Sequence, residues 1–209
     1  VVLKVLLDAN VLLPQQQRNI ILQIALKHRI ELHWTKLIVE EWLRNVEPAV
    51  RGNCERRTLP LMAKYFPRAE LPAMPATPYG STDAKDRHVA AAAVHVAPSV
   101  LVTWNIRDFD RSALAGHGVT LQTPDQLISN LYDQFPDLTY EAALEAKANL
   151  SRSAPSWDDF IALLAGNGLT TFVQRIDEHH KRLSYECEDE ERSEEEEDRT
   201  DYTGSSGPP

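Results

Sequence analysis

Apolar and polar positions follow a regular order along the first 130 residues, and that order predicts strands alternating with helices. Short runs with strand character occupy residues 3–7, 30–35, 99–104 and 119–123. Apolar residues at helical spacing occupy residues 15–28, 36–46 and 81–96, and a capping box opens a further helix at Thr123. Strands that alternate with helices four times predict an α/β fold, with helices on both faces of a parallel sheet.

The pattern is different in the rest of the chain. Six prolines interrupt residues 47–82, so we expect a short helix near 55–66 followed by a loop. Helical spacing dominates after residue 130, over 139–150, 156–166 and 170–183. These changes predict three parts, with the boundaries 1–130 for an α/β domain, 131–183 for a helical extension and 184–209 for an acidic tail. We expect the tail to be disordered because it has little apolar surface to bury.

The acidic net charge of the chain does not exclude a nucleic-acid partner, because the excess of acidic residues is concentrated in one segment. The formal net charge is −9, but residues 186–201 alone hold eleven acidic and two basic side chains. The remaining chain has twenty residues of each sign, so acidity does not exclude a nucleic-acid partner. No apolar run is long enough to span a bilayer, and no leader opens the sequence. Two distant cysteines form no recognisable disulfide framework, so we expect a cytoplasmic protein.

Acidic and amide side chains follow the strands of the predicted sheet. Asp8 and Asn10 come after the first strand, and Asn105 and Asp108 come after the third. Nearby helices add the neighbouring pairs Glu40/Glu41 and Asp83/Asp86. Ligands bind at the carboxyl ends of parallel strands, so we expect these groups to meet at one edge. Clustered carboxylates repel one another unless a cation neutralises them, and oxygen ligands suit Mg²⁺ or Mn²⁺, ions that promote phosphodiester hydrolysis.

Each of these residues also has a purely structural interpretation. Asp8 could form a turn, Asp83 could cap a helix, and Asp86 could complement a helix dipole. Glu40 and Glu41 could be solvated charges, and Asp108 a loop acid. A basic stretch after the Glu41 helix could bind RNA phosphates or be ordinary surface charge; its members include Arg44, Arg51, Arg56 and Arg57.

Four segments, in this order and at these separations, resemble the PIN domain, and most closely the VapC-type toxins of toxin–antitoxin pairs. They are "LLDANVLL", "TKLIVEEWLRNV", "DAKDRHVAAAA" and "LVTWNIRDF". The resemblance covers about residues 3–128. Residues 139–183 resemble the C-terminal extension of some of these toxins. The resemblance implies an α/β/α sandwich, Mg²⁺-dependent endoribonuclease activity on RNA, restraint by a cognate antitoxin, and usually a homodimer.

The same resemblance implies roles for individual residues. Catalytic and metal-binding positions match Asp8, Glu41, Asp86 and Asp108. Glu41 matches the family's helix glutamate better than Glu40 does. Asn105 stands where many members have aspartate, which leaves open whether one or two ions bind. Supporting positions are Asn105, Thr103, Asn10 and Asp83.

Two rival interpretations remain open at the level of sequence. A haloacid-dehalogenase-type phosphatase needs a second aspartate two residues after the first, where this chain has Asn10. A PIN-like scaffold that only binds a protein partner is favoured by Asn105 alone. Metal-dependent RNA cleavage that is lost in Asp8→Asn would distinguish an enzyme from such a scaffold.

Overall fold

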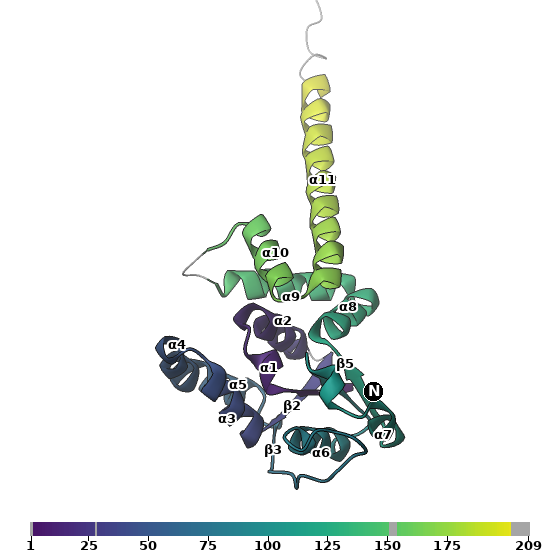
Figure 1. Ribbon diagram of the computed structural model, residues 1–209. Helices are drawn as coiled ribbons and strands as arrows, with labels where there is room; N and C mark the ends of the chain where they lie inside the picture. Colours follow the sequence, from purple (N-terminus) through teal and green to yellow (C-terminus); the bar gives the residue numbers. More distant parts are fainter. Residues whose placement is uncertain (1, 28, 151–153, 202–209) are drawn as a thin grey trace, which may run out of the picture.

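A parallel sheet of five strands forms the centre of the protein (Figure 1). The computed structural model describes residues 2–27, 29–150 and 154–201. The strand order is β3-β2-β1-β4-β5, and the strands are β1 (Leu3–Leu7), β2 (Ile30–Thr35), β3 (Glu70–Leu71), β4 (Ser99–Val102) and β5 (Val119–Gln122). The expected α/β fold with a parallel sheet is confirmed.

Strand β1 lies in the middle of the sheet, which explains its continuous apolar sequence. Val5, Leu6 and Leu7 are fully buried, because both faces of the sheet are covered. Leu7 pairs with Val102, the last residue of β4. The residues that follow these two strands, Asp8 and Thr103, therefore start from neighbouring positions at the same edge.

Helices cover both faces of the sheet, in the manner of an α/β/α sandwich (Figure 1). Helix α6 (Arg87–His95) contacts β1, β2 and β4, and its fully buried Ala90, Ala92 and Ala93 allow a close approach. Helix α2 (Gln15–Leu26) contacts β2, and α8 (Pro124–Gln134) contacts β5. Helix α3 (Lys36–Asn45) contacts β2, and α7 (Arg111–Gly116) contacts β5.

The structure differs from the predictions mainly where the elements are short. Strand β3 was not expected, because a two-residue strand in a proline-rich stretch has no periodicity. Helix α1 (Ala9–Leu12) occupies the apolar run after Asp8. The expected helix over 81–96 begins only at Arg87, since a turn precedes it. The segment after α3 holds α4 (Pro48–Asn53), a π-helical turn η1 (Cys54–Thr58) and α5 (Leu59–Tyr65).

Three helices form the C-terminal part: α9 (Pro136–Ala148), α10 (Trp157–Gly166) and α11 (Thr170–Asp201). Helix α9 packs on α2 and α8, and α10 contacts α2 and α11. The predicted helix end near residue 183 is wrong, because α11 continues to Asp201 and projects from the body (Figure 1). Glutamate, which occupies eight of the fourteen positions 186–199, has a high helix propensity. Residues 202–209 of the predicted tail lie outside the described residues.

Among the described residues, no helix has the length and apolar character required to cross a membrane.

Candidate active site

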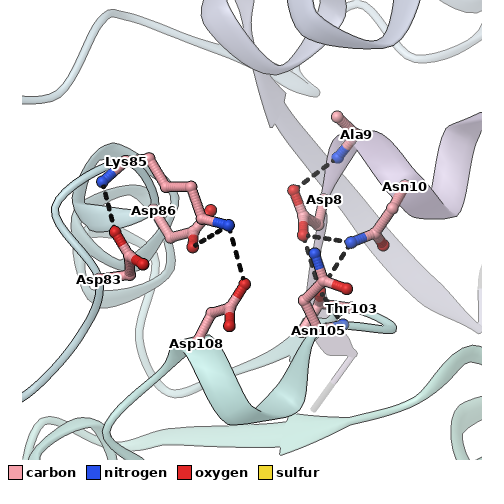
Figure 2. A network of polar contacts seen from close by, with 9 residues as sticks. All are labelled: Asp8, Ala9, Asn10, Asp83, Lys85, Asp86, Thr103, Asn105 and Asp108. Carbon is pink, nitrogen blue, oxygen red and sulfur yellow. Dashed lines mark hydrogen bonds and ion pairs between the residues drawn. The ribbon is translucent and has the colours of Figure 1, made fainter. Parts of the chain in front are cut away.

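Asp8 links the end of β1 to the start of α1 (Figure 2). Its backbone N–H donates to the Val102 carbonyl at 3.1 Å, which continues the β1–β4 ladder by one bond. Its Oδ1 accepts a hydrogen bond from the Ala9 N–H at 2.7 Å, so the carboxylate caps the helix. The structural interpretation of Asp8 therefore holds, and it leaves the second carboxylate oxygen available for other contacts.

That second oxygen, Oδ2, accepts two hydrogen bonds from polar neighbours. The Thr103 hydroxyl donates to it at 2.7 Å, and the Asn10 amide donates at 2.9 Å. Thr103 Oγ1 in turn accepts from the Asn10 amide at 3.1 Å and from the Asn105 backbone N–H at 3.0 Å. Thr103 and Asn10 thus fix the orientation of the Asp8 carboxylate.

Burial dominates the electrostatics of Asp8, which is 4% exposed. Loss of water raises the pKa of this carboxyl group, and the hydrogen bonds from Thr103 and Ala9 partly oppose that rise. The negative charge of Glu41 adds to the rise. Asp8 carries its charge at a free-energy cost that a nearby cation would remove.

Asp86 precedes the first residue of α6 and faces the same region. Its side chain makes no capping hydrogen bond, and the buried Oδ2 has no hydrogen-bond partner. Burial raises the pKa of Asp86 to about 6; the Lys85 ammonium opposes this shift, and the charges of Asp8 and Asp108 add to it. The three carboxylates therefore act on one another electrostatically.

The Lys85 ammonium forms ion pairs with two carboxylates of this cluster (Figure 2). Its Nζ lies 3.1 Å from Asp108 Oδ2 and 3.8 Å from Asp86 Oδ2. Asp108 belongs to a 3-10 turn, η2 (Ile106–Asp108), that follows β4. Sequence reasoning missed Lys85, although its position between Asp83 and Asp86 in "DAKD" gave a signal that an internal counter-ion was present.

Asp83 connects the loop before α6 to the turn after β4 by a hydrogen bond. Its backbone N–H donates to the Asp108 carbonyl at 2.8 Å, and its carboxylate accepts from the Lys85 backbone N–H at 3.2 Å. Asp83 is exposed to solvent. Asp83 shapes the turn before α6 rather than capping that helix, which corrects the expectation that it could be the N-cap.

The structure distinguishes the two adjacent glutamates of α3. Glu40 is exposed, and its carboxylate lies 3.8 Å from Lys36 Nζ. Glu41 is half-buried and near enough to raise the pKa of Asp8. Of the pair, Glu41 is therefore the one associated with the acidic cluster.

The remaining predicted residues are Asn105 and the four arginines of the basic stretch. Asn105 is exposed, and its backbone contacts Thr103. The four predicted RNA-binding arginines follow Glu41 along the chain, on α3, α4 and η1. Arg51 donates to the Arg44 carbonyl at 3.1 Å, and Arg44, Arg56 and Arg57 are exposed.

The carboxylate oxygens of the cluster suit a hard divalent cation, although the Lys85 ammonium lies beside two of these carboxylates. Within the described residues, no group of three or more His, Cys, Asp or Glu side chains is placed to hold a metal ion. The Lys85 ammonium lies beside two of the carboxylates, and neutral donors satisfy the third. The buried Asp86 oxygen without a hydrogen bond and the all-oxygen donor set are nevertheless typical of a Mg²⁺ or Mn²⁺ site.

Comparisons with known proteins agree with this geometry. The family model for the PIN domain matches residues 4–107, and the model for the VapC50 C-terminal domain matches residues 124–178. No curated protein matches the chain, and no solved structure matches it. The first match spans β1 to β4 and contains Asp8, Glu41 and Asp86, whereas Asp108 lies one residue beyond its end; the second spans α8, α9, α10 and the first part of α11. The chain therefore belongs to the PIN-domain family of nucleases, as a VapC-type protein with a C-terminal extension.

Proposed function

We propose that this protein is an endoribonuclease that depends on Mg²⁺ or Mn²⁺ and acts as the toxin of a toxin–antitoxin pair. The main support is the convergence of three carboxylates: Asp8 after β1, Asp108 in the turn after β4, and Asp86 just before α6. Burial raises the pKa of both Asp8 and Asp86; the charge of Glu41 adds to the rise at Asp8, and the charges of Asp8 and Asp108 add to the rise at Asp86. Carboxylates with perturbed pKa values cluster at functional sites.

In this proposal the cation is held by the carboxylates of Asp8, Glu41, Asp86 and Asp108. When bound, the ion supplies positive charge that stabilises the negative charge developing on the phosphodiester. Thr103 and Asn10 keep the Asp8 carboxylate in one orientation. Asn105 offers an amide in place of a further carboxylate, so the number of ions stays undecided between one and two.

Lys85 has a specific part in the proposed mechanism. Without a divalent ion, its ammonium neutralises part of the charge on Asp86 and Asp108. A divalent ion at the same carboxylates would repel this ammonium and free it to contact an RNA phosphate. Exposure of the Lys85 side chain leaves room for this movement.

The substrate side of the proposal depends on the arginines of α3, α4 and η1. Exposed Arg44, Arg56 and Arg57 offer sequence-independent contacts to RNA phosphates, and Arg51 braces the segment through the Arg44 carbonyl. Cleavage should then weaken as salt concentration rises, because cations compete for the phosphates. A homodimer and a cognate antitoxin remain predictions from the family.

Cleavage of RNA by purified protein tests the nuclease proposal. With Mg²⁺ or Mn²⁺ present, the wild-type protein should cut RNA, and EDTA should stop the reaction. Asp8→Asn should abolish cleavage, because the amide cannot supply the lost negative charge. Cleavage that survives this substitution would exclude Asp8 as a ligand, whereas inactivity of the wild-type protein on all RNA would favour a protein-binding scaffold.

The adjacent glutamates provide a matched pair for the same assay. Glu41→Gln should lower cleavage at least about tenfold, since it removes a charge near Asp8. Glu40→Gln removes the same charge one residue away, from an exposed position, and should leave cleavage unchanged. Equal effects of the two substitutions would contradict the assignment of Glu41.

Induced expression in a bacterial host tests the toxin role separately. The wild-type chain should arrest growth, and Asp86→Ala should not. Co-expression of a short DNA-binding protein encoded next to this chain should restore growth. Growth arrest that persists in Asp86→Ala would show that toxicity does not arise from the acidic cluster.

A further inference from the structure

Trp104 lies where the sheet domain meets the C-terminal helices. It directly follows Thr103, and its indole N–H donates to the Gln17 side chain on α2 at 3.2 Å. On Gly168, which follows α10, an added Cβ would lie 2.9 Å from Trp104 Cη2. The indole ring therefore packs directly against the backbone of the α10–α11 turn.

The shape of this turn requires glycine at position 168. Its φ angle is +86°, a left-handed conformation that other residues adopt only with strain. The Gly168 N–H donates to the Ala165 carbonyl at 2.9 Å, and the Leu169 N–H donates to Leu164 at 3.1 Å. Leu169 is fully buried. The turn has a fixed path and no space for a larger residue at the contact.

The far side of the turn is fastened to α8. Asp125, which is buried, accepts hydrogen bonds from the N–H groups of Thr171 at 3.1 Å and Phe172 at 2.9 Å. These N–H groups open α11, where a carboxylate is favoured by the helix dipole. Phe172 is also fully buried. The turn therefore cannot retreat from Trp104 without breaking these contacts.

The near side of Trp104 connects to the acidic cluster. Its backbone N–H donates to Asn10 Oδ1 at 3.1 Å, and the Asn10 amide donates to Asp8 Oδ2. We infer that the C-terminal helices act as a clamp on the active site, with Trp104 as a positioning residue that transmits their packing to Asn10 and Asp8. The inference rests on the proposed function for its catalytic consequence, but the clamp itself is a separate structural claim.

Two glycines of the same helix end provide the test. Gly168→Ala places a methyl group against Trp104 in a strained conformation. Gly166→Ala serves as the control, because a Cβ at that position meets no atom within 4 Å and its backbone is not left-handed. Both substitutions add one methyl group, two residues apart.

RNA cleavage and the indole N–H resonance give independent readouts. The chain has four tryptophans, and Trp104→Phe identifies the Trp104 resonance by its loss. Gly168→Ala should shift that resonance and lower kcat by about 10- to 100-fold, with a smaller change in KM, because misplaced catalytic groups mainly slow the chemical step. Gly166→Ala should change neither quantity.

A double substitution keeps the test decisive if Gly168→Ala folds poorly. Trp104→Leu removes the ring atoms that the new methyl group would meet, so Gly168→Ala should cost less kcat in that background than in the wild type. A folded Gly168→Ala protein with a shifted indole resonance and unchanged kcat would overturn the positioning role. An unshifted resonance would overturn the clamp, whether or not the protein cleaves RNA.

Discussion

Asp86→Asn should stabilise the protein in the absence of divalent ions while removing its activity. Burial raises the pKa of Asp86 from its ordinary 3.8 to about 6 in the folded state. The folded protein therefore resists ionisation of this group more than the unfolded chain does. The carboxylate begins to destabilise the fold as pH rises above 3.8, and the full loss of stability is present above pH 6. Asparagine has no charge to bury, so the substitution removes this loss.

The size of the gain follows from the same pKa. About 1.4 kcal/mol per pKa unit sets an upper limit of about 3 kcal/mol. Solvent reaches one side of the carboxylate and screens it, so we expect a gain of about 1–2 kcal/mol at pH 7.5. This corresponds to an increase in Tm of about 3–6 °C for a chain of this length. At pH 4.5 only about one third of the gain should remain, because Asp86 is then protonated in the folded protein.

Thermal unfolding in EDTA at pH 4.5 and 7.5 measures these values. Asp110→Asn is the control of opposite sign, because backbone N–H groups of Ala113 and Ser81 lower the pKa of Asp110. That substitution should lower Tm by similar amounts at pH 7.5 and pH 4.5, because both values lie above the ordinary pKa of 3.8 and the carboxylate is charged in the folded protein at each. A decrease in Tm for Asp86→Asn at pH 7.5, or equal gains at the two pH values, would refute the reasoning.

The other predictions concern the groups that surround Asp8 and Asp86. Thr103→Val should destabilise the fold by about 1–3 kcal/mol in chemical denaturation, because the buried Asp8 carboxylate loses a hydrogen-bond donor. Thr103→Ser keeps the hydroxyl and should retain most of the stability. An equal loss of stability in the two variants would contradict the role of the hydroxyl. Lys85→Met should tighten Mn²⁺ binding in calorimetry at least about threefold, because no ammonium then competes for the carboxylates; weaker binding would show that Lys85 is not a competitor.

The sequence predicts the sheet better than it predicts the site. The range 3–7 matches β1, because a strand buried on both faces has a continuous apolar run. The range 30–35 matches β2, whose β-branched and aromatic residues favour a strand. Parallel order then places Asp8 and the residues after β4 at one edge. Helix α1 could not be predicted, since "VLL" fits a strand as well as a four-residue helix.

The spacing of apolar residues along the chain does not show which charged side chains form ion pairs. Lys85 was missed because the segment "DAKD" places a lysine beside acids but does not show that its side chain reaches Asp108 on another loop. The contact between Gly168 and Trp104 was missed for the same reason, because it joins residues 64 positions apart in sequence. The family resemblance placed the acids in order along the chain, and only the structure shows the lysine between them.

The central position of β1 determines when the acidic site is completed during translation. Strand β1 leaves the ribosome before its partner β4, which lies about 90 residues further along the chain. At synthesis rates of about 5–20 residues per second, roughly 5–20 s pass before β4 can pair beside it. Throughout that interval Asp8 has neither Thr103 nor Asp86 beside it. Until β4 has been made, a nascent chain of this protein cannot form the acidic site that the proposed cleavage of RNA requires.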